Sequence, residues 1–300
     1  MVRTIAGWRP LWARLVVVLL LVVVLDVAAG LGLLPVDRLV PGGPVGVVAV
    51  VVALAVMPLL MGVAPRSERT DPVVLAPPVR GEWTAVNSPG QSIPSHGTRT
   101  RGQLSAIDVC GRSTASSPRL VRWGLRGTRP EAYPGFDAPV HAMAAGEVVR
   151  VVDRQRDHRA RDTWQGLAWM MTLEGIVREV GGTPRVLGNH VVVRHQDGTV
   201  AVYAHLRCGS VTEAAVAAGS RVGVGDVLGR VGNTGNTSMP HLHVQVMDSV
   251  RTDAAAGLPL AWSRIETTGE IDPPFEAYAK EPAASALPGM PRNGEVFRAG

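Results

Sequence analysis

Two long apolar runs begin the chain, and short alternating runs fill most of the rest. The first apolar run covers about residues 15–34 and the second about residues 45–63, with a Pro- and Gly-rich connection at 35–44. Each run has about 20 residues, the length of α-helix that crosses the ~30 Å hydrocarbon core of a bilayer. Residues 1–65 are therefore predicted to form a hairpin of two transmembrane helices.

One alternative for the first run stays open. Three arginines precede it and Ala28-Ala29 lies near its end, which is also the pattern of a cleaved signal peptide. Asp26 inside a transmembrane helix is energetically costly, and this favours the same alternative. The sequence thus allows either a two-helix anchor or one helix preceded by a removable leader.

Beyond the apolar runs the period of the pattern changes. Residues 66–90 carry charged residues and several prolines, and they are predicted to be a linker. Further on, short Val-rich runs such as 146–152 alternate between glycine turns, as β-strands with one buried face do. Residues 91–250 are predicted to form an all-β domain of antiparallel sheets with a barrel-like or sandwich-like core. Residues 251–300, rich in Pro and Ala, are predicted to be a C-terminal tail.

Residues 154–188 interrupt the strands. After a charged beginning, apolar residues recur at helical spacing from Trp164 to Val180, and Gly181-Gly182 ends the run. One inserted helix is therefore predicted between two strands. The sequence leaves open whether this helix packs over a sheet, borders a substrate groove or lies against a membrane.

The amino-acid composition bears on which molecules the protein could bind. The formal net charge is +5 and Lys280 is the sole lysine, so the positive charge is almost entirely arginine. Aromatic residues make up only 4% and do not alternate with the arginines, which argues against nucleic acid as a partner. Two cysteines, Cys110 and Cys208, are too few for a disulfide framework but enough for one bridge.

The candidate chemistry lies in histidines on predicted strands. His241 and His243 are two residues apart, so on a strand they share one face, roughly 7 Å from each other. Alone, such a pair is more often a surface feature than a metal site. Here it follows histidine motifs at 188–198 and 202–206 and a glycine-punctuated run at 218–235.

This order of motifs resembles that of the LytM/lysostaphin-type zinc metallopeptidases, peptidase family M23, over about residues 90–250. The resemblance implies a zinc-dependent endopeptidase that hydrolyses peptide bonds of peptidoglycan with a zinc-activated water. The sequence departs from the family at Gln245, where a glutamate is common, and in the spacing of the first two metal ligands.

The resemblance also assigns the metal ligands. It implies that His96, Asp108 and His243 bind Zn²⁺ and leave one coordination position open. The long gap between His96 and Asp108 predicts a loop that brings His96 back, at a modest cost in closure entropy. Asp137 is a rival for Asp108, whereas His141 matches an ordinary strand position of the family.

The remaining histidines of the pattern receive catalytic roles. In the family, the positions of His205 and His241 face the open coordination position, which implies that they orient and deprotonate the attacking water and stabilise the oxyanion. Asn189 and Tyr203 are candidates for contacts with the substrate, although turn capping and core packing explain them equally well. The histidines predicted to be structural or at the surface are His158, His190 and His195.

The cysteines lie close to these residues in sequence. Cys110 follows Asp108 by two residues and Cys208 follows His205 by three. A disulfide that braces the site is therefore predicted if the domain lies outside the cytoplasm, and two unpaired thiols are the alternative.

Two functions remain in competition. One is a membrane-anchored zinc endopeptidase acting on peptidoglycan. The other is a catalytically silent wall-binding domain that activates another cell-wall hydrolase, and a regulatory protein partner is compatible with both. The presence of all five His and Asp positions favours the enzyme. A biotinyl or lipoyl carrier is excluded because residues 146–245 contain no lysine.

The predicted location involves a conflict. Arginines flank both apolar runs, so the positive-inside rule places both flanks in the cytoplasm. A cell-wall peptidase has no substrate there. Because large domains are translocated largely regardless of charge, the prediction is a cell-membrane protein whose catalytic domain faces outward.

Overall fold

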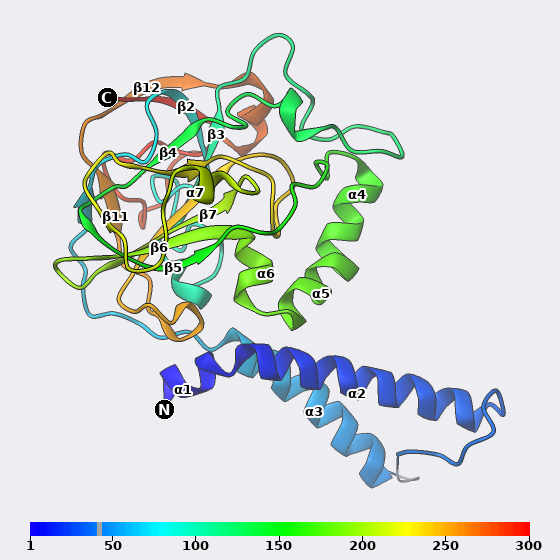
Figure 1. Cartoon of the computed structure of the whole chain (residues 1–300). Coiled ribbons are helices and arrows are strands. Elements are labelled where there is room, and N and C mark those ends of the chain that lie inside the picture. The colour runs from blue at the N-terminus through cyan, green and yellow to red at the C-terminus, as the bar shows by residue number, and fades with distance from the viewer. Residues whose placement is uncertain (41–43) are drawn as a thin grey trace.

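The computed structural model describes residues 1–40 and 44–300 (Figure 1). A helical hairpin is formed by α2 (Arg9–Gly30) and α3 (Pro44–Gly62), preceded by the short α1 (Val2–Gly7). Both α2 and α3 are long and apolar enough to cross a membrane. The predicted Pro- and Gly-rich connection between them includes residues 41–43, which lie outside the described residues. Helix α2 begins at Arg9, earlier than the apolar run from residue 15 predicts, because residues 9–14 are also helical.

The hairpin contacts the β domain through arginines of α1 and α2. Both terminal nitrogens of Arg3 donate to the Asp248 carboxylate, over 3.1 and 2.6 Å. Arg14 Nε donates to the carbonyl of Val180 over 3.2 Å. The N-terminal helices thus pack against the β domain through these polar contacts.

The β domain is organised around one nine-stranded sheet in which every neighbouring pair is antiparallel. Its strand order is β12-β13-β2-β3-β10-β7-β6-β5-β8. The bounds are β2 (Gly81–Val86), β3 (Ile107–Gly111), β5 (Gly146–Val152), β6 (Asn189–His195), β7 (Val200–Leu206), β8 (Arg221–Val222), β10 (Leu242–Met247), β12 (Ile265–Ile271) and β13 (Glu295–Ala299). The predicted all-β, antiparallel fold is confirmed.

Two small sheets and several short helices complete the domain. The strands β4 (Pro139–His141) and β9 (Val227–Arg230) pair antiparallel, whereas β1 (Val73–Leu75) and β11 (Leu260–Trp262) pair parallel. The short helical segments are η1 (Thr100–Gly102), η2 (Pro130–Ala132), α6 (Thr183–Leu187), α7 (Ser210–Glu213), η4 (Thr252–Ala254) and η5 (Pro273–Tyr278).

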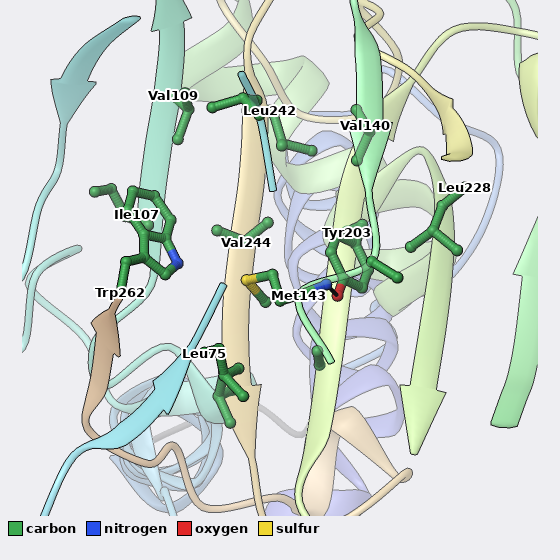
Figure 2. Packing of buried hydrophobic residues seen from close by; sticks show 14 of the residues in the cluster. Leu75, Ile107, Val109, Val140, Met143, Tyr203, Leu228, Leu242, Val244 and Trp262 are labelled. Carbon is green, nitrogen blue, oxygen red and sulfur yellow. Dashed lines mark hydrogen bonds between the residues drawn. The ribbon is translucent and has the colours of Figure 1, made fainter. Parts of the chain in front are cut away.

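The main core lies between one face of the large sheet and the two small sheets (Figure 2). Alternate residues of the central strands point into it, as the two-residue period of a strand requires. The residues that Figure 2 labels in this core are Leu75, Ile107, Val109, Val140, Met143, Tyr203, Leu228, Leu242, Val244 and Trp262. The intervening residues of β3 and β10 therefore point to the opposite face.

The domain extends beyond the predicted bounds of 91 and 250 on both sides. The predicted linker at 66–90 contains β1 and most of β2, and the predicted tail at 251–300 contains β11, β12 and β13. In the sheet, β13 lies between β12 and β2, with Phe297 opposite Trp83. The predicted boundaries are wrong because they rest on local composition, whereas these strands are defined by pairing with partners far away in sequence.

The insertion forms one continuous helical stretch from Trp164 to Val180. It consists of α4 (Trp164–Trp169), a π-helical segment η3 (Met170–Glu174) and α5 (Gly175–Val180). Thr163 caps its beginning, since its hydroxyl accepts a hydrogen bond from the Gly166 N–H over 3.1 Å. No residue of the stretch is buried, so this helix does not pack over a sheet.

Because β13 belongs to the core, we expect Phe297→Ala to destabilise the protein by about 3–5 kcal/mol. The Phe297 side chain is fully buried, and its ring centroid lies 5.5 Å from that of Trp262. Urea unfolding of the full chain in detergent micelles measures the change. Tyr278→Ala, an aromatic truncation at a half-exposed position, serves as the control and should cost far less. Equal stability of Phe297→Ala and the unmodified chain would show that the C-terminal strand is not part of the core.

Candidate metal centre

The centre of the site is a cross-strand pair on the face of the sheet opposite the main core. Asp108 of β3 and His243 of β10 are directly opposite each other in the antiparallel register. Directly opposed side chains share a face and lie close together. Accordingly, His243 Nδ1 is 2.8 Å from Asp108 Oδ1.

His96 reaches the pair through a loop, as the sequence predicts. The loop is closed at Ser95, whose N–H donates to the carbonyl of Leu104 over 3.1 Å and whose hydroxyl donates to that of Ala106 over 2.5 Å. This places His96 Nε2 3.2 Å from both carboxylate oxygens of Asp108. One ligand atom from each of His96, Asp108 and His243 lies within 4.8 Å of the others.

Hydrogen bonds on the outer side of each ring determine which nitrogen faces the centre. Because the Ser95 hydroxyl donates to Ala106, its oxygen is left to accept from His96 Nδ1, 3.3 Å away. That arrangement puts the proton of His96 on Nδ1 and leaves the Nε2 lone pair toward Asp108. A second polar group that fixes the tautomer of a histidine is typical of metal-binding sites.

Gln245 plays the same part for His243. Its amide nitrogen donates to the Arg101 carbonyl over 2.6 Å, so its oxygen faces His243 Nε2 at 3.1 Å and accepts the ring proton. The lone pair of His243 is therefore on Nδ1, the nitrogen nearest Asp108. Gln245 replaces the glutamate that is common in the resembling family and provides an equivalent acceptor.

His205 joins the site because of a local break in the strand alternation. Ala204 is opposite His243, so regular alternation would turn His205 toward the main core. Instead His205 has a φ of 63°, and the next residue, Leu206, points into the core. The ring of His205 consequently lies on the site face, with its centroid 4.8 Å from that of His241 and 5.8 Å from that of His243. A left-handed conformation at a non-glycine residue stores about 1–3 kcal/mol of strain and often marks a functional site.

His205 and His241 have the same orientation toward the centre. Nδ1 of His205 donates to the Thr234 carbonyl over 2.8 Å, and Nδ1 of His241 donates to the Met239 carbonyl over 2.8 Å. In the neutral form of each ring the proton is therefore on Nδ1 and the lone pair on Nε2. The Nε2 atom of His241 lies 3.5 Å from Asp108 Oδ1.

The electrostatics of the site follow from burial and proximity. Burial raises the pKa of a carboxyl group, but at Asp108 the nearby His96 and His241 outweigh it and hold the pKa well below its usual range. Burial is also the main cause that lowers the pKa of His205 far below its ordinary value. At His241 the effect of burial is overcome by Asp108, so the pKa is raised.

These donors fit a divalent transition-metal ion. Two imidazole nitrogens and one carboxylate oxygen are a ligand set that suits Zn²⁺ in catalytic sites, where a fourth position is open. The tautomers set by Ser95 and Gln245 present lone pairs rather than protons to the centre. The residues that would bind the metal are His96, Asp108 and His243.

The structure separates the rival candidates from this cluster. Asp137 is half-exposed and forms an ion pair with Arg207 Nε over 2.6 Å. His141 lies on β4, where its Nδ1 hydrogen-bonds the Gly225 carbonyl over 2.8 Å. Each of the three histidines predicted to be structural hydrogen-bonds groups outside the cluster, namely Arg159 and Gly235 for His158, Gly188 for His190, and Thr199 for His195.

Asn189 and Tyr203 are not placed to contact a substrate. Asn189 is fully buried, and its amide exchanges hydrogen bonds with the backbone of Gln155 over 2.8 and 2.7 Å. Tyr203 is also fully buried in the main core, where its hydroxyl accepts from the Met143 N–H over 2.7 Å (Figure 2). The turn-capping and core-packing explanations therefore hold, and the predicted substrate contacts are wrong.

The predicted disulfide is also absent, since Cys110 and Cys208 are both free thiols. Cys110 is buried on β3, and Cys208 follows β7, with β10 between these two strands. Two strand spacings amount to roughly 10 Å, more than the ~7 Å between Cα atoms that a disulfide can bridge. Proximity in sequence to the site residues did not translate into proximity to each other.

Several residues that support the site escaped the sequence analysis. The amide of Asn87, just beyond β2, donates to Asp108 Oδ2 over 2.7 Å, and Ser95 and Arg101 orient the ligands indirectly. Among the residues that support the metal ligands, Gln245 alone stood out in the sequence, because it departs from the family pattern. Asn87 lies in the stretch predicted to be a linker, so the sequence provided no reason to expect its hydrogen bond to Asp108.

One region of the chain matches a known protein family. Residues 170–254 match the model of Peptidase family M23, a range that includes His205, His241 and His243. The chain is 34% identical over 82 residues to the cell division protein DipM of Caulobacter vibrioides. That match covers 27% of this chain and 13% of DipM, so the chain corresponds to a small part of that relative.

Solved structures with a similar arrangement include two peptidases. The catalytic domain of the antimicrobial peptidase lysostaphin from Staphylococcus simulans is 18% identical and covers 59% of this chain and 88% of its own, with a TM-score of 0.30. The M23 metalloprotease pseudoalterin is 15% identical and covers 76% of this chain and 95% of its own, with a TM-score of 0.36.

The geometry predicts that Gln245 supports metal binding. Gln245→Ala should weaken zinc affinity by about 10–100-fold, the usual cost of losing a group that orients a histidine ligand. Gln245→Glu keeps an acceptor for His243 Nε2 and should retain most of the affinity. Competition with a fluorescent zinc chelator measures both, with the exposed Gln196→Ala as the control. Equal affinities for Gln245→Ala and Gln196→Ala would contradict this role.

Proposed function

We propose that this chain is a zinc-dependent metalloendopeptidase that hydrolyses peptide bonds of peptidoglycan, in keeping with the match of residues 170–254 to the model of peptidase family M23. The observation that carries the proposal is that three imidazoles, those of His96, His241 and His243, lie 2.8–3.5 Å from Asp108. The ring of His205 lies beside two of them, and each of the four rings has its outer nitrogen engaged in a hydrogen bond. A cluster built only for stability would not need four rings whose outer nitrogens are all fixed by hydrogen bonds.

The roles of the side chains follow from this geometry. Zn²⁺ held by His96, Asp108 and His243 would supply a Lewis acid that polarises the scissile carbonyl. In their neutral form His241 and His205 each have a lone pair on Nε2, which can accept a proton from the attacking water. The carbonyls of Met239 and Thr234 hold these rings in place during the transfer.

We also propose that α2 and α3 anchor the chain in the cell membrane with the β domain outside the cytoplasm. The peptidoglycan substrate requires that location. Arg3 and Arg9, which count toward a cytoplasmic N-terminus, form ion pairs with Asp248 and Glu179 of the β domain. With these contacts formed, the N-terminus lies on the same side of the membrane as the β domain. Large domains are translocated largely regardless of the flanking charge, so the arginines do not decide on which side that is.

The function is tested by separating metal binding from hydrolysis. We expect the purified full chain to hold about one zinc per molecule by elemental analysis, in keeping with one set of three ligands. Asp108→Ala should lose the metal. His241→Ala and His205→Ala should retain it but cut purified cell-wall sacculi about 10²–10⁴-fold more slowly, as the loss of a general base predicts.

His141→Ala is the matched control, since this histidine lies outside the cluster and should leave both zinc content and hydrolysis unchanged. Full zinc content in Asp108→Ala would overturn the ligand assignment. A zinc-loaded wild-type chain that binds sacculi and cleaves none would instead identify a silent domain that activates another hydrolase.

The proposed topology has its own test. A reporter joined after Ala299 should be active if it is alkaline phosphatase, which folds only after export. The same junction with green fluorescent protein should be dark. The hairpin ends at α3 and the β domain follows it, so one junction reports on the whole domain. A fluorescent, phosphatase-negative result would place the domain in the cytoplasm and rule out the wall as its substrate.

A further inference from the structure

The inserted helical stretch has its polar side chains turned toward the protein. Glu174 forms ion pairs with Arg161 over 2.8 Å and with Arg178 over 2.5 Å. Glu179 pairs with Arg101, a buried residue of η1, over 2.9 Å. The pairs with Arg161 and Arg101 bind the stretch to the rest of the domain through charge, whereas the Glu174–Arg178 pair lies within the stretch.

Its apolar side chains point the other way. Six of them expose about half or more of their surface, from 49% at Ile176 to 74% at Met171, whereas Leu167, Met170 and Val180 are partly buried. These six form what we call the outer face, which consists of Trp164, Trp169, Met171, Leu173, Ile176 and Val177. A helix on the surface of a soluble domain has the opposite arrangement, with apolar residues inward and charged residues outward. An exposed apolar surface of this kind marks a contact with something outside the domain.

A neighbouring loop extends the outer face. Trp123 is 79% exposed, and its ring centroid lies 6.3 Å from that of Trp164. Leu125, two residues further on, is almost fully exposed. Three tryptophans therefore lie on or beside this surface, and tryptophan is enriched where proteins meet the boundary between headgroups and acyl chains.

The outer face is continuous with the helical hairpin. An apolar cavity of about 330 Å³ lies between Val16 and Leu20 of α2, Met61 of α3 and Ile176 of α5. Figure 1 shows the green α4–α5 stretch running steeply across the direction of α2 and meeting it at the lower end of α5. If α2 crosses a bilayer, its axis is close to the membrane normal. The α4–α5 stretch, which runs across that axis, then lies roughly parallel to the membrane surface.

What covers the hairpin must therefore also cover the outer face. In the most apolar 18 residues of α2 only 11% are buried within the protein, and in those of α3 only 6%. We infer that the outer face binds the surface of a phospholipid bilayer, so that the β domain lies against the membrane through α4 and α5 as well as being tethered to it. An interfacial helix of this type inserts its apolar face about 5–10 Å into the boundary region. This inference rests on the membrane insertion proposed above for α2 and α3.

The test uses the full chain in phosphatidylcholine–phosphatidylglycerol nanodiscs. Cys208→Ser removes the accessible thiol, since Cys110 is buried, and single cysteines are then introduced by Met171→Cys or Val177→Cys. An environment-sensitive fluorophore is attached to each. We expect a blue shift and the loss of most of the emission when lipids with nitroxide-labelled acyl chains are included.

Two reference positions make the result decisive. Val224→Cys, on the β8–β9 turn, is matched to Val177 in residue type and is likewise mostly exposed, and it should not be quenched. Leu21→Cys in α2 should be quenched if the hairpin spans the bilayer. Quenching at Leu21 without quenching at Met171 and Val177 would overturn the inference and leave the anchor intact. The absence of quenching at Leu21 as well would overturn both.

Discussion

The buried carboxylate of Asp108 is the group on which the site depends. An ionised carboxylate removed from water is costly unless it is paired, and here His96, His243 and Asn87 all face its two oxygens. These partners come from the end of β2, from the loop before β3 and from β10. The site is therefore complete only when the centre of the large sheet has formed, and assembly of the sheet and assembly of the site are one event.

The part of the fold that was predictable is the part encoded locally. Alternation of apolar residues predicts strands such as β5 and β6, and helical spacing predicts the inserted helix. The chain contains no comparable local signal for β2 and β13, because their stability derives from pairing with each other and with β3. Charged and Pro-rich composition at 66–90 and 251–300 therefore indicated a linker and a tail where the structure has strands.

The site shows the same division. The spacing of His241 and His243 predicted a shared face, and the loop that returns His96 to Asp108 followed from the long gap between them. His205 reaches the site only through its left-handed backbone, which no spacing rule reveals. Asn189 and Tyr203 were ambiguous because sequence does not report burial, and the same lack of information made the two cysteines look like partners. In each case the sequence did not show how the backbone bends or which residues lie next to each other in space.

The position of β13 has a consequence for the order in which the molecule is made. Thr84 of β2 pairs with Val296 of β13, more than 200 residues later in the chain. During synthesis β2 lacks this neighbour until nearly the whole β domain has been translated, and contacts so distant in sequence form slowly. The two apolar helices, in contrast, emerge first and need no partner beyond each other. The membrane insertion proposed for these helices can thus take place while the β domain is still an open chain, the state in which a polypeptide can be threaded across a bilayer.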